Sequence, residues 1–135
     1  MAMEEHSQRV HHVPAGALSE ATAQTSGMRR LAAISGATVG AQALWMGQSH
    51  VAPGASSGMH HHGESETGIF VLSGHPVFSY QEDGKEVHVR TAPGDFVYVP
   101  PFVHHVESNP SASEEAVVVL ARTTQEVIVV NVETL

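Results

Sequence analysis

Apolar residues along the chain gather in short runs that are separated by turns rich in glycine and proline. Short runs of branched and aromatic residues that alternate with polar ones are typical of β-strands. No window of about 11 residues shows a convincing helical period, and the nearest candidate is the alanine-rich segment 15–23. Many short strands with frequent turns indicate a β-sandwich or a closed barrel. The pattern predicts strands at residues 31–39, 41–51, 69–72, 77–81, 85–89, 96–99, 103–106, 116–121 and 127–132.

The two ends of the chain carry a weaker pattern. Residues 1–30 are polar and irregular and predict an N-terminal arm with one edge strand at 10–13, followed by a single barrel domain over 31–135. Near the C-terminus, residues 127–130 are four apolar residues in a row. Such a run suggests burial on both faces, either as a fully buried strand or in a dimer interface.

Composition narrows the class of protein. A chain of 135 residues with 41% hydrophobic and 15% charged residues suits one globular domain. The net charge of −8 argues against partners such as nucleic acids or anionic membranes, which need clustered lysine and arginine. There is no cysteine, which excludes disulfides, cysteine-based metal sites and cysteine nucleophiles and fits a cytoplasmic location. Neither a signal peptide nor a membrane-spanning apolar segment is evident.

Five of the 11 histidines lie in two clusters, His60 to His62 and His104 to His105, and the first is followed by Glu64 and Glu66. Alternate residues of a strand face the same side, so His60 and His62 can point into a barrel while His61 points away. Only one histidine of the second cluster should face the same interior. Imidazole nitrogen, with or without a carboxylate, binds Mn, Fe, Ni, Co, Cu and Zn. The clusters therefore predict a site for one divalent transition metal.

Histidines outside the two clusters are interpreted as ordinary solvated or structural residues, with His50 left open as a pocket residue. Other chemistries have weak support, because no serine stands in a nucleophile elbow and no glycine-rich stretch has phosphate-loop spacing. The residues given the ordinary reading are His6, His11, His12, His75 and His88.

The first cluster resembles the first motif of the cupin superfamily. That motif runs Gly, five residues, His-x-His, three or four residues, Glu, six residues, Gly. Gly54, His60, His62 and Glu66 fit the spacing, but seven residues separate Glu66 from Gly74. Either a bulge near residues 67–68 absorbs the extra residue, or Glu66 points away and the site uses three histidines and water.

The second cluster resembles the second cupin motif, which runs Gly, five residues, Pro-x-Gly, two residues, His, three residues, Asn. Gly94, Pro100, His105 and Asn109 stand at the required spacing, and Phe102 stands where the motif has glycine. This register favours His105 over His104. The two motifs together span roughly residues 41–121.

The resemblance implies an all-β fold, a double-stranded β-helix or jelly-roll barrel that commonly forms a homodimer. It assigns His60, His62, Glu66 and His105 as metal ligands, with Glu66 also a candidate catalytic base. We expect a metal-dependent enzyme of the dioxygenase, isomerase or decarboxylase type that acts on a small organic molecule. The alternatives are a non-catalytic module that binds a small molecule or sugar, and a barrel that binds metal without any small-molecule role.

Overall fold

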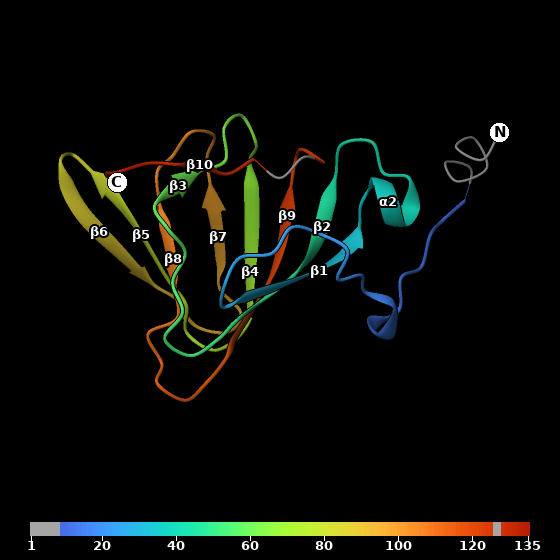
Figure 1. Ribbon diagram of the computed structural model, residues 1–135, viewed down its shortest axis with the longest axis horizontal. Coiled ribbons are helices and arrows are strands. Elements are labelled where there is room, and N and C mark those ends of the chain that lie inside the picture. Colours follow the sequence, from blue (N-terminus) through green and yellow to red (C-terminus); the bar gives the residue numbers. More distant parts are fainter. Residues whose placement is uncertain (1–8, 126–127) are drawn as a thin grey trace.

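Antiparallel strands form most of the computed structural model, which describes residues 9–125 and 128–135. The largest sheet has five strands (Figure 1). Most strands that are adjacent in this sheet are not consecutive in the sequence, as expected for a jelly roll. The all-β prediction is confirmed. In spatial order the strands are β1 (Met28–Ile34), β2 (Trp45–Val51), β9 (Ala116–Arg122), β4 (Thr67–Ser73) and β7 (Phe96–Val99).

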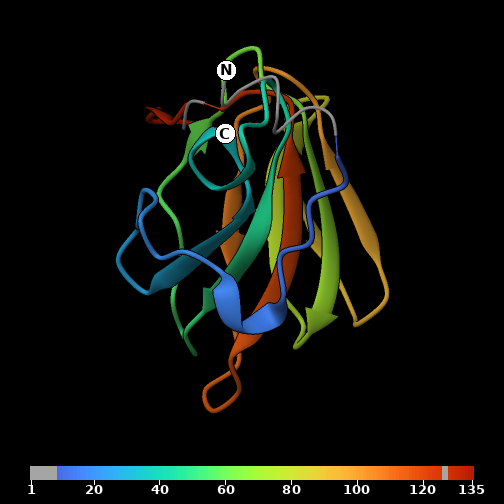
Figure 2. The same cartoon turned by 90° about the vertical axis from the view of Figure 1, so that its right-hand side faces the viewer.

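Two smaller sheets complete the barrel. One has three strands, in the order β6 (Lys85–Arg90), β5 (Val77–Glu82) and β8 (Val106–Ser108). The other is the short pair β10 (Val130–Asn131) and β3 (His60–His61). Figure 1 shows this pair at one end of the larger sheets, and Figure 2 shows the long strands running side by side below it.

The inward positions of the strands change character along the barrel. Along β2, every second residue is buried, from Trp45 to Val51. In the middle of the barrel the inward residues are apolar and form one cluster, which stabilises the fold by roughly 1.5–3 kcal/mol per buried side chain. Towards one end they become polar, where Thr67 of β4 pairs with Arg122 of β9. The apolar cluster consists of Ile69, Val71, Phe78, Val99 and Val118.

The strand predicted at residues 31–39 is wrong beyond Ile34. The chain instead makes one helical turn, α2 (Gly36–Val39), because Ser35 and Thr38 form a reciprocal capping box at its start. Gly40 ends the turn with a left-handed φ of 72°. As a result the next strand begins at Trp45, four residues later than the predicted start at residue 41.

The predicted edge strand at residues 10–13 is also wrong, because that segment is irregular and leads into the short 3-10 helix η1 (Ala15–Ala17). Ser19 then pairs with Ala32 of β1 through two backbone hydrogen bonds of 2.8 and 2.9 Å. The division into an arm at 1–30 and a domain at 31–135 stays a prediction. His6 lies outside the described residues.

The C-terminal strand is much shorter than the predicted 127–132. Val129 and Val130 are 44% and 43% exposed, so the interpretation as a fully buried strand is wrong for these two residues. Val127 lies outside the described part of the chain. The strand predicted at 103–106 is displaced to Val106–Ser108, because Phe102 turns the chain with a φ of 62° just before it. Among the described residues, no helix is long and apolar enough to cross a membrane.

Candidate metal centre

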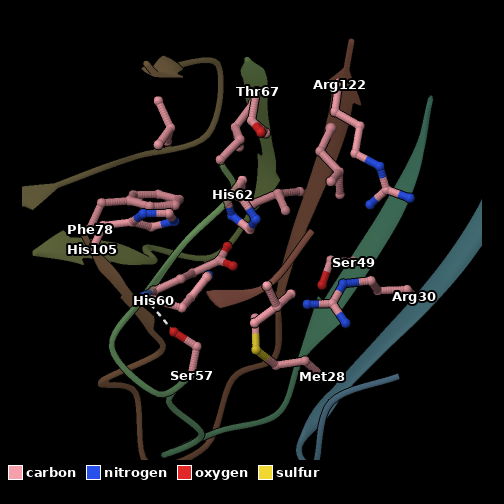
Figure 3. Close-up of a pocket in the computed structure, with 16 residues that line it drawn as sticks. Met28, Arg30, Ser49, Ser57, His60, His62, Thr67, Phe78, His105 and Arg122 are labelled. Carbon is pink, nitrogen blue, oxygen red and sulfur yellow. Dashed lines mark hydrogen bonds between the residues drawn. The ribbon is translucent and has the colours of Figure 1, made fainter. Parts of the chain in front are cut away.

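Three histidines from the two sequence clusters meet inside the polar end of the barrel (Figure 3). His60 and His105 face each other across a β-bridge, in which each donates a backbone N–H to the carbonyl of the other, at 3.1 and 2.9 Å. His62 lies two residues after His60 and therefore points to the same side. The ring centroids lie 4.5 to 5.0 Å apart.

Each of these three rings is oriented by a hydrogen bond to a backbone carbonyl. A carbonyl oxygen only accepts, so each Nδ1 carries the proton and donates it. Nε2 is then left unprotonated, which is the state that binds a metal. One ligand nitrogen from each ring lies within 4.8 Å of the other two. The carbonyls that accept from His60, His62 and His105 belong to Gly58 (2.7 Å), Ile128 (2.8 Å) and Val103 (3.0 Å).

Burial keeps the three rings neutral. It lowers the pKa of His62 and of His105 to about 4, while the hydrogen bonds to the carbonyls act in the opposite direction. The pKa of His60 is also lowered, mainly by burial. At neutral pH the rings therefore need to lose no proton to accept a metal ion, and the donor set fits a divalent transition metal. These are three of the four residues that the sequence assigns as ligands.

The structure does not bring the fourth residue, Glu66, to this group. Its side chain is exposed on the outside of the barrel, where the hydroxyl of Tyr98 donates a hydrogen bond of 2.6 Å to Oε1. This bond raises the pKa of Tyr98. Thr67, the next residue, is 5% exposed and lines the histidine cavity. Of the two alternatives left open by the sequence, this structure matches the one in which Glu66 points away.

The extra residue before Gly74 is absorbed at a different place from the one expected. The pairing of β4 with β9 is regular from Thr67 to Val71 and shifts between Val71 and Ser73. Leu72 is therefore the bulged residue, and it is 51% exposed. In the motif, six residues separate the glutamate from the second glycine. Counted back from Gly74, this glutamate position is occupied by Thr67 rather than Glu66.

The other histidines of the two clusters lie on the outside, as predicted from alternation. His61 and His104 are stacked, with ring centroids 5.3 Å apart and an interplanar angle of 11°. His50, which the sequence leaves open, does not line the histidine cavity, because its ring is bonded to Glu115 and Gln48, each at 3.1 Å.

Polar residues that the sequence analysis missed also line this cavity, which has a volume of about 60 Å³, and four of them bear on its chemistry. Arg30 and Ser49 are cross-strand partners on β1 and β2 (Figure 3). Arg122 is at the end of β9, and Glu107 is in β8. Strand alternation could have predicted the inward orientation of two of them. Glu107 lies two residues after His105, and Ser49 lies between the buried positions Gly47 and Val51.

The charges in the cavity influence one another. Burial raises the pKa of Glu107 to about 7, and the charge of Arg30 acts against this shift. Burial, with a smaller effect from Arg30, lowers the pKa of Arg122 to about 10. The Arg122 guanidinium lies 4.1 Å from the ring centroid of Trp45, which is 3% exposed and so belongs to the core. Two side-chain oxygens, Ser49 Oγ and Glu107 Oε1, are buried without a hydrogen-bond partner among the described residues.

A second cleft, of about 380 Å³, adjoins the histidine cavity. Its walls are mainly apolar and aromatic, and it shares Phe78, Val99 and His105 with that cavity. Phe78, Val99 and His105 therefore lie at the boundary between the histidine cavity and this larger space, which is lined by residues of β5, β6 and β7.

Comparison with known proteins agrees with this geometry. The family model described as Cupin domain matches residues 47–121, more than half of the chain and both histidine clusters. The chain belongs to the cupin family. The cupin fold inferred from the two motifs is thus confirmed.

One curated relative is similar to this cupin over a short segment. The chain is 45% identical to acireductone dioxygenase of Bacillus pumilus over 47 residues, and these residues make up 34% of this chain and 26% of that protein. The chain thus spans about a quarter of the length of this curated relative.

Solved structures share the fold at low identity. An oxalate oxidase in complex with glycolate has a TM-score of 0.67 at 17% identity, over 81% of this chain and 57% of its own. A mutant of oxalate decarboxylase from Bacillus subtilis has a TM-score of 0.68 at 19% identity, over 82% and 29%. Peruvianin-I, a cysteine peptidase from Thevetia peruviana latex, has a TM-score of 0.68 at 16% identity, over 87% and 74%. Such different names show that the shared fold does not by itself fix an activity.

Proposed function

We propose that this cupin is a metal-dependent enzyme that acts on a small organic acid. The observation that carries the proposal is the lining of one cavity by three neutral histidines and two arginines. The histidines supply a metal-binding set, and the arginines supply the positive charge and the N–H donors that carboxylates prefer. A solvated histidine turn, the ordinary alternative, would not combine these groups in the barrel interior.

His60, His62 and His105 would hold one divalent transition ion through their unprotonated Nε2 atoms. Mn, Fe, Ni, Co, Cu and Zn all accept such ligands. When bound, the ion polarises a coordinated oxygen and, if it is redox-active, exchanges electrons. The chain holds the rings in one tautomer through the backbone carbonyls, and the apolar cluster below them keeps bulk water away from one side of the site.

The size of the cavity points to a small substrate. A volume of about 60 Å³ has room for roughly four water-sized groups, so the cavity itself admits only the shortest carboxylic acids. A longer substrate would need to reach past Phe78 and Val99 into the adjoining cleft. The names of the similar proteins, acireductone dioxygenase, oxalate oxidase and oxalate decarboxylase, support oxidation or decarboxylation over other reactions.

The test combines metal analysis with a substrate screen. Protein purified without a metal-affinity column is analysed for bound metal, reloaded with each candidate ion, and assayed for oxygen uptake and carbon dioxide release with short mono- and dicarboxylic acids. We expect turnover that disappears in His62→Ala and persists in His61→Ala, because His61 faces outward. Stoichiometric metal without turnover of any acid would contradict the proposed enzyme.

A non-catalytic binding module is the second candidate. The narrow cavity favours it, because a space of about 60 Å³ leaves little room for both an acid and a second reactant. Calorimetric titration with the same acids distinguishes the two. Saturable binding with no product after prolonged incubation would support the module.

We also propose a homodimer that acts in the cytoplasm. Among the described residues, strand β10 pairs with β3 alone, and Val130 of β10 and the preceding Val129 are exposed, so a second copy of the chain could cover this edge. Light scattering on the wild type and Val130→Lys tests the dimer, since a charged residue at the edge should shift it to monomer. Cell fractionation tests the location.

A further inference from the structure

We infer that Glu107, rather than Glu66, supplies the negative charge of the metal centre. The inference rests on the proposed function, because it requires a metal ion at the three histidines. It changes the composition of the site. The carboxylate comes from the strand that follows the second cluster, on the same side of the chain as His105.

The backbone around Glu107 directs its side chain inward. The residue pairs with Phe78 of β5, and directly opposed residues of an antiparallel pair face the same side of the sheet. Phe78 is 4% exposed and belongs to the apolar cluster, so Glu107 also faces the interior. Ser57 fixes the other edge, because its Oγ accepts a 3.0 Å hydrogen bond from the Glu107 N–H and its own N–H donates to the Glu107 carbonyl at 2.8 Å.

One oxygen of the Glu107 carboxyl group lacks a hydrogen-bond partner among the described residues. Glu107 Oε1 is buried and accepts no hydrogen bond from the described residues. Arg30 influences it through charge, but no ion pair joins these two described side chains. A buried acceptor without a partner is costly, and native proteins rarely keep one without a use. A divalent cation at the neighbouring histidines would provide the missing attraction, either directly or through a bound water.

Glu66 shows the opposite set of properties. It is exposed, it lies outside the histidine cavity, and the hydroxyl of Tyr98 already donates to it at 2.6 Å. The two glutamates therefore form a matched pair of the same residue type. Replacing each by the neutral isostere glutamine removes one negative charge, in one case from the cavity and in the other from the surface.

The experiment is a zinc titration of the metal-free protein, with affinity measured by competition against a chelator. We expect Glu107→Gln to weaken zinc binding by roughly 10- to 100-fold, the range typical of groups that support metal ligands. Glu66→Gln should bind within about twofold of the wild type, since exposed charges interact weakly through water. Glu107→Asp, which keeps the charge, should recover most of the loss.

The outcomes separate this inference from the proposed function. Wild type that binds zinc, together with Glu107→Gln of equal affinity, would overturn the inference and leave the proposed function standing. A larger loss in Glu66→Gln than in Glu107→Gln would overturn it in favour of the assignment made from the sequence motif. Wild type that binds none of the divalent ions would remove the proposed function itself. Thermal unfolding of each metal-free variant shows whether that variant is folded. If Glu107→Gln is not folded, the zinc affinity of Glu107→Asp decides between these outcomes.

Discussion

The Asn109 side chain donates a hydrogen bond of 3.0 Å from Nδ2 to the carbonyl oxygen of Val51. The same amide donates at 2.7 Å to the Glu114 carbonyl, and its Oδ1 accepts at 3.1 Å from the N–H of Ser111. Asn109 is 2% exposed. The last residue of the second motif thus has a structural role, since it fastens the loop after β8 to the end of β2.

Replacing Asn109 by alanine should destabilise the protein. The change removes three hydrogen bonds, one of them to the carbonyl of the buried Val51, so we expect the free energy of unfolding to fall by about 3 kcal/mol. Urea unfolding followed by tryptophan fluorescence measures it, since Trp45 is buried. The control is Asn131→Ala at an exposed position, for which we expect a change within about 0.5 kcal/mol. Equal stability of the two variants would contradict this role for Asn109.

Metal binding should depend on His105 and not on the adjacent His104. His105 is 6% exposed and faces the cavity, whereas the ring of His104 stacks on His61 outside it. We expect His105→Ala to retain no stoichiometric metal by elemental analysis and His104→Ala to retain the wild-type content. Loss of metal in both variants, with both folded, would mean that the outer stack also takes part in binding.

Phe102 should be a position where glycine is more favourable than alanine. Its φ of 62° lies in the left-handed region, which costs a residue with a side chain about 1 kcal/mol or more. Both substitutions remove the contact with the His61 ring, whose centroid lies 5.9 Å away. Comparing the two variants therefore isolates the backbone strain, and we expect Phe102→Gly to be more stable than Phe102→Ala by about 1 kcal/mol in chemical unfolding. The reverse order would show that the turn changes conformation without the phenyl ring.

Local patterns in the sequence were enough to predict much of this site. The alternation rule alone separated His60 and His62 from His61, because a strand that crosses the barrel end leaves no other orientation. The cupin motif register then selected His105 over His104. Apolar and alternating runs located β4 to β7 and β9 within a few residues, and in all of these except the exposed β6 the buried positions include branched or aromatic side chains.

Features that depend on pairing between distant strands could not be predicted in this way. The position of Glu66 depends on where β4 absorbs one extra residue, and the bulge at Leu72 is visible only in the register against β9. Arg30 and Ser49 meet the histidines because β2 lies beside β9 and β1 lies beside β2, an order that no local pattern encodes. The turn at Gly36–Val39 was missed because Thr38 and Val39 favour a strand, whereas the capping box of Ser35 favours a helix.

The stability of the metal-free protein should fall as the pH is lowered from about 6.5 towards about 4.5. The pKa of His62 and of His105 is about 4 in the folded protein, against 6.5 for an ordinary histidine. Between these values the unfolded chain binds a proton at each site and the folded protein does not. Unfolding therefore takes up protons, and acid favours it. This contribution is complete above pH 6.5 and is lost as the pH approaches the folded pKa.

Glu107 opposes this trend, because its pKa is raised from 4.5 to about 7, so that it keeps a proton in the folded state that the unfolded chain releases. Two protons taken up by His62 and His105 minus one released by Glu107 leave a net uptake of about one, or about 1.4 kcal/mol per pH unit, and the lowered pKa of His60 adds to the uptake in the same direction. Urea unfolding of metal-free protein at a series of pH values measures this slope. We expect Glu107→Gln to make it steeper and His62→Ala to make it shallower, since each variant removes one of the opposing contributions. A wild-type stability that rises on acidification through this window would contradict the neutral state of the histidine rings in the folded protein.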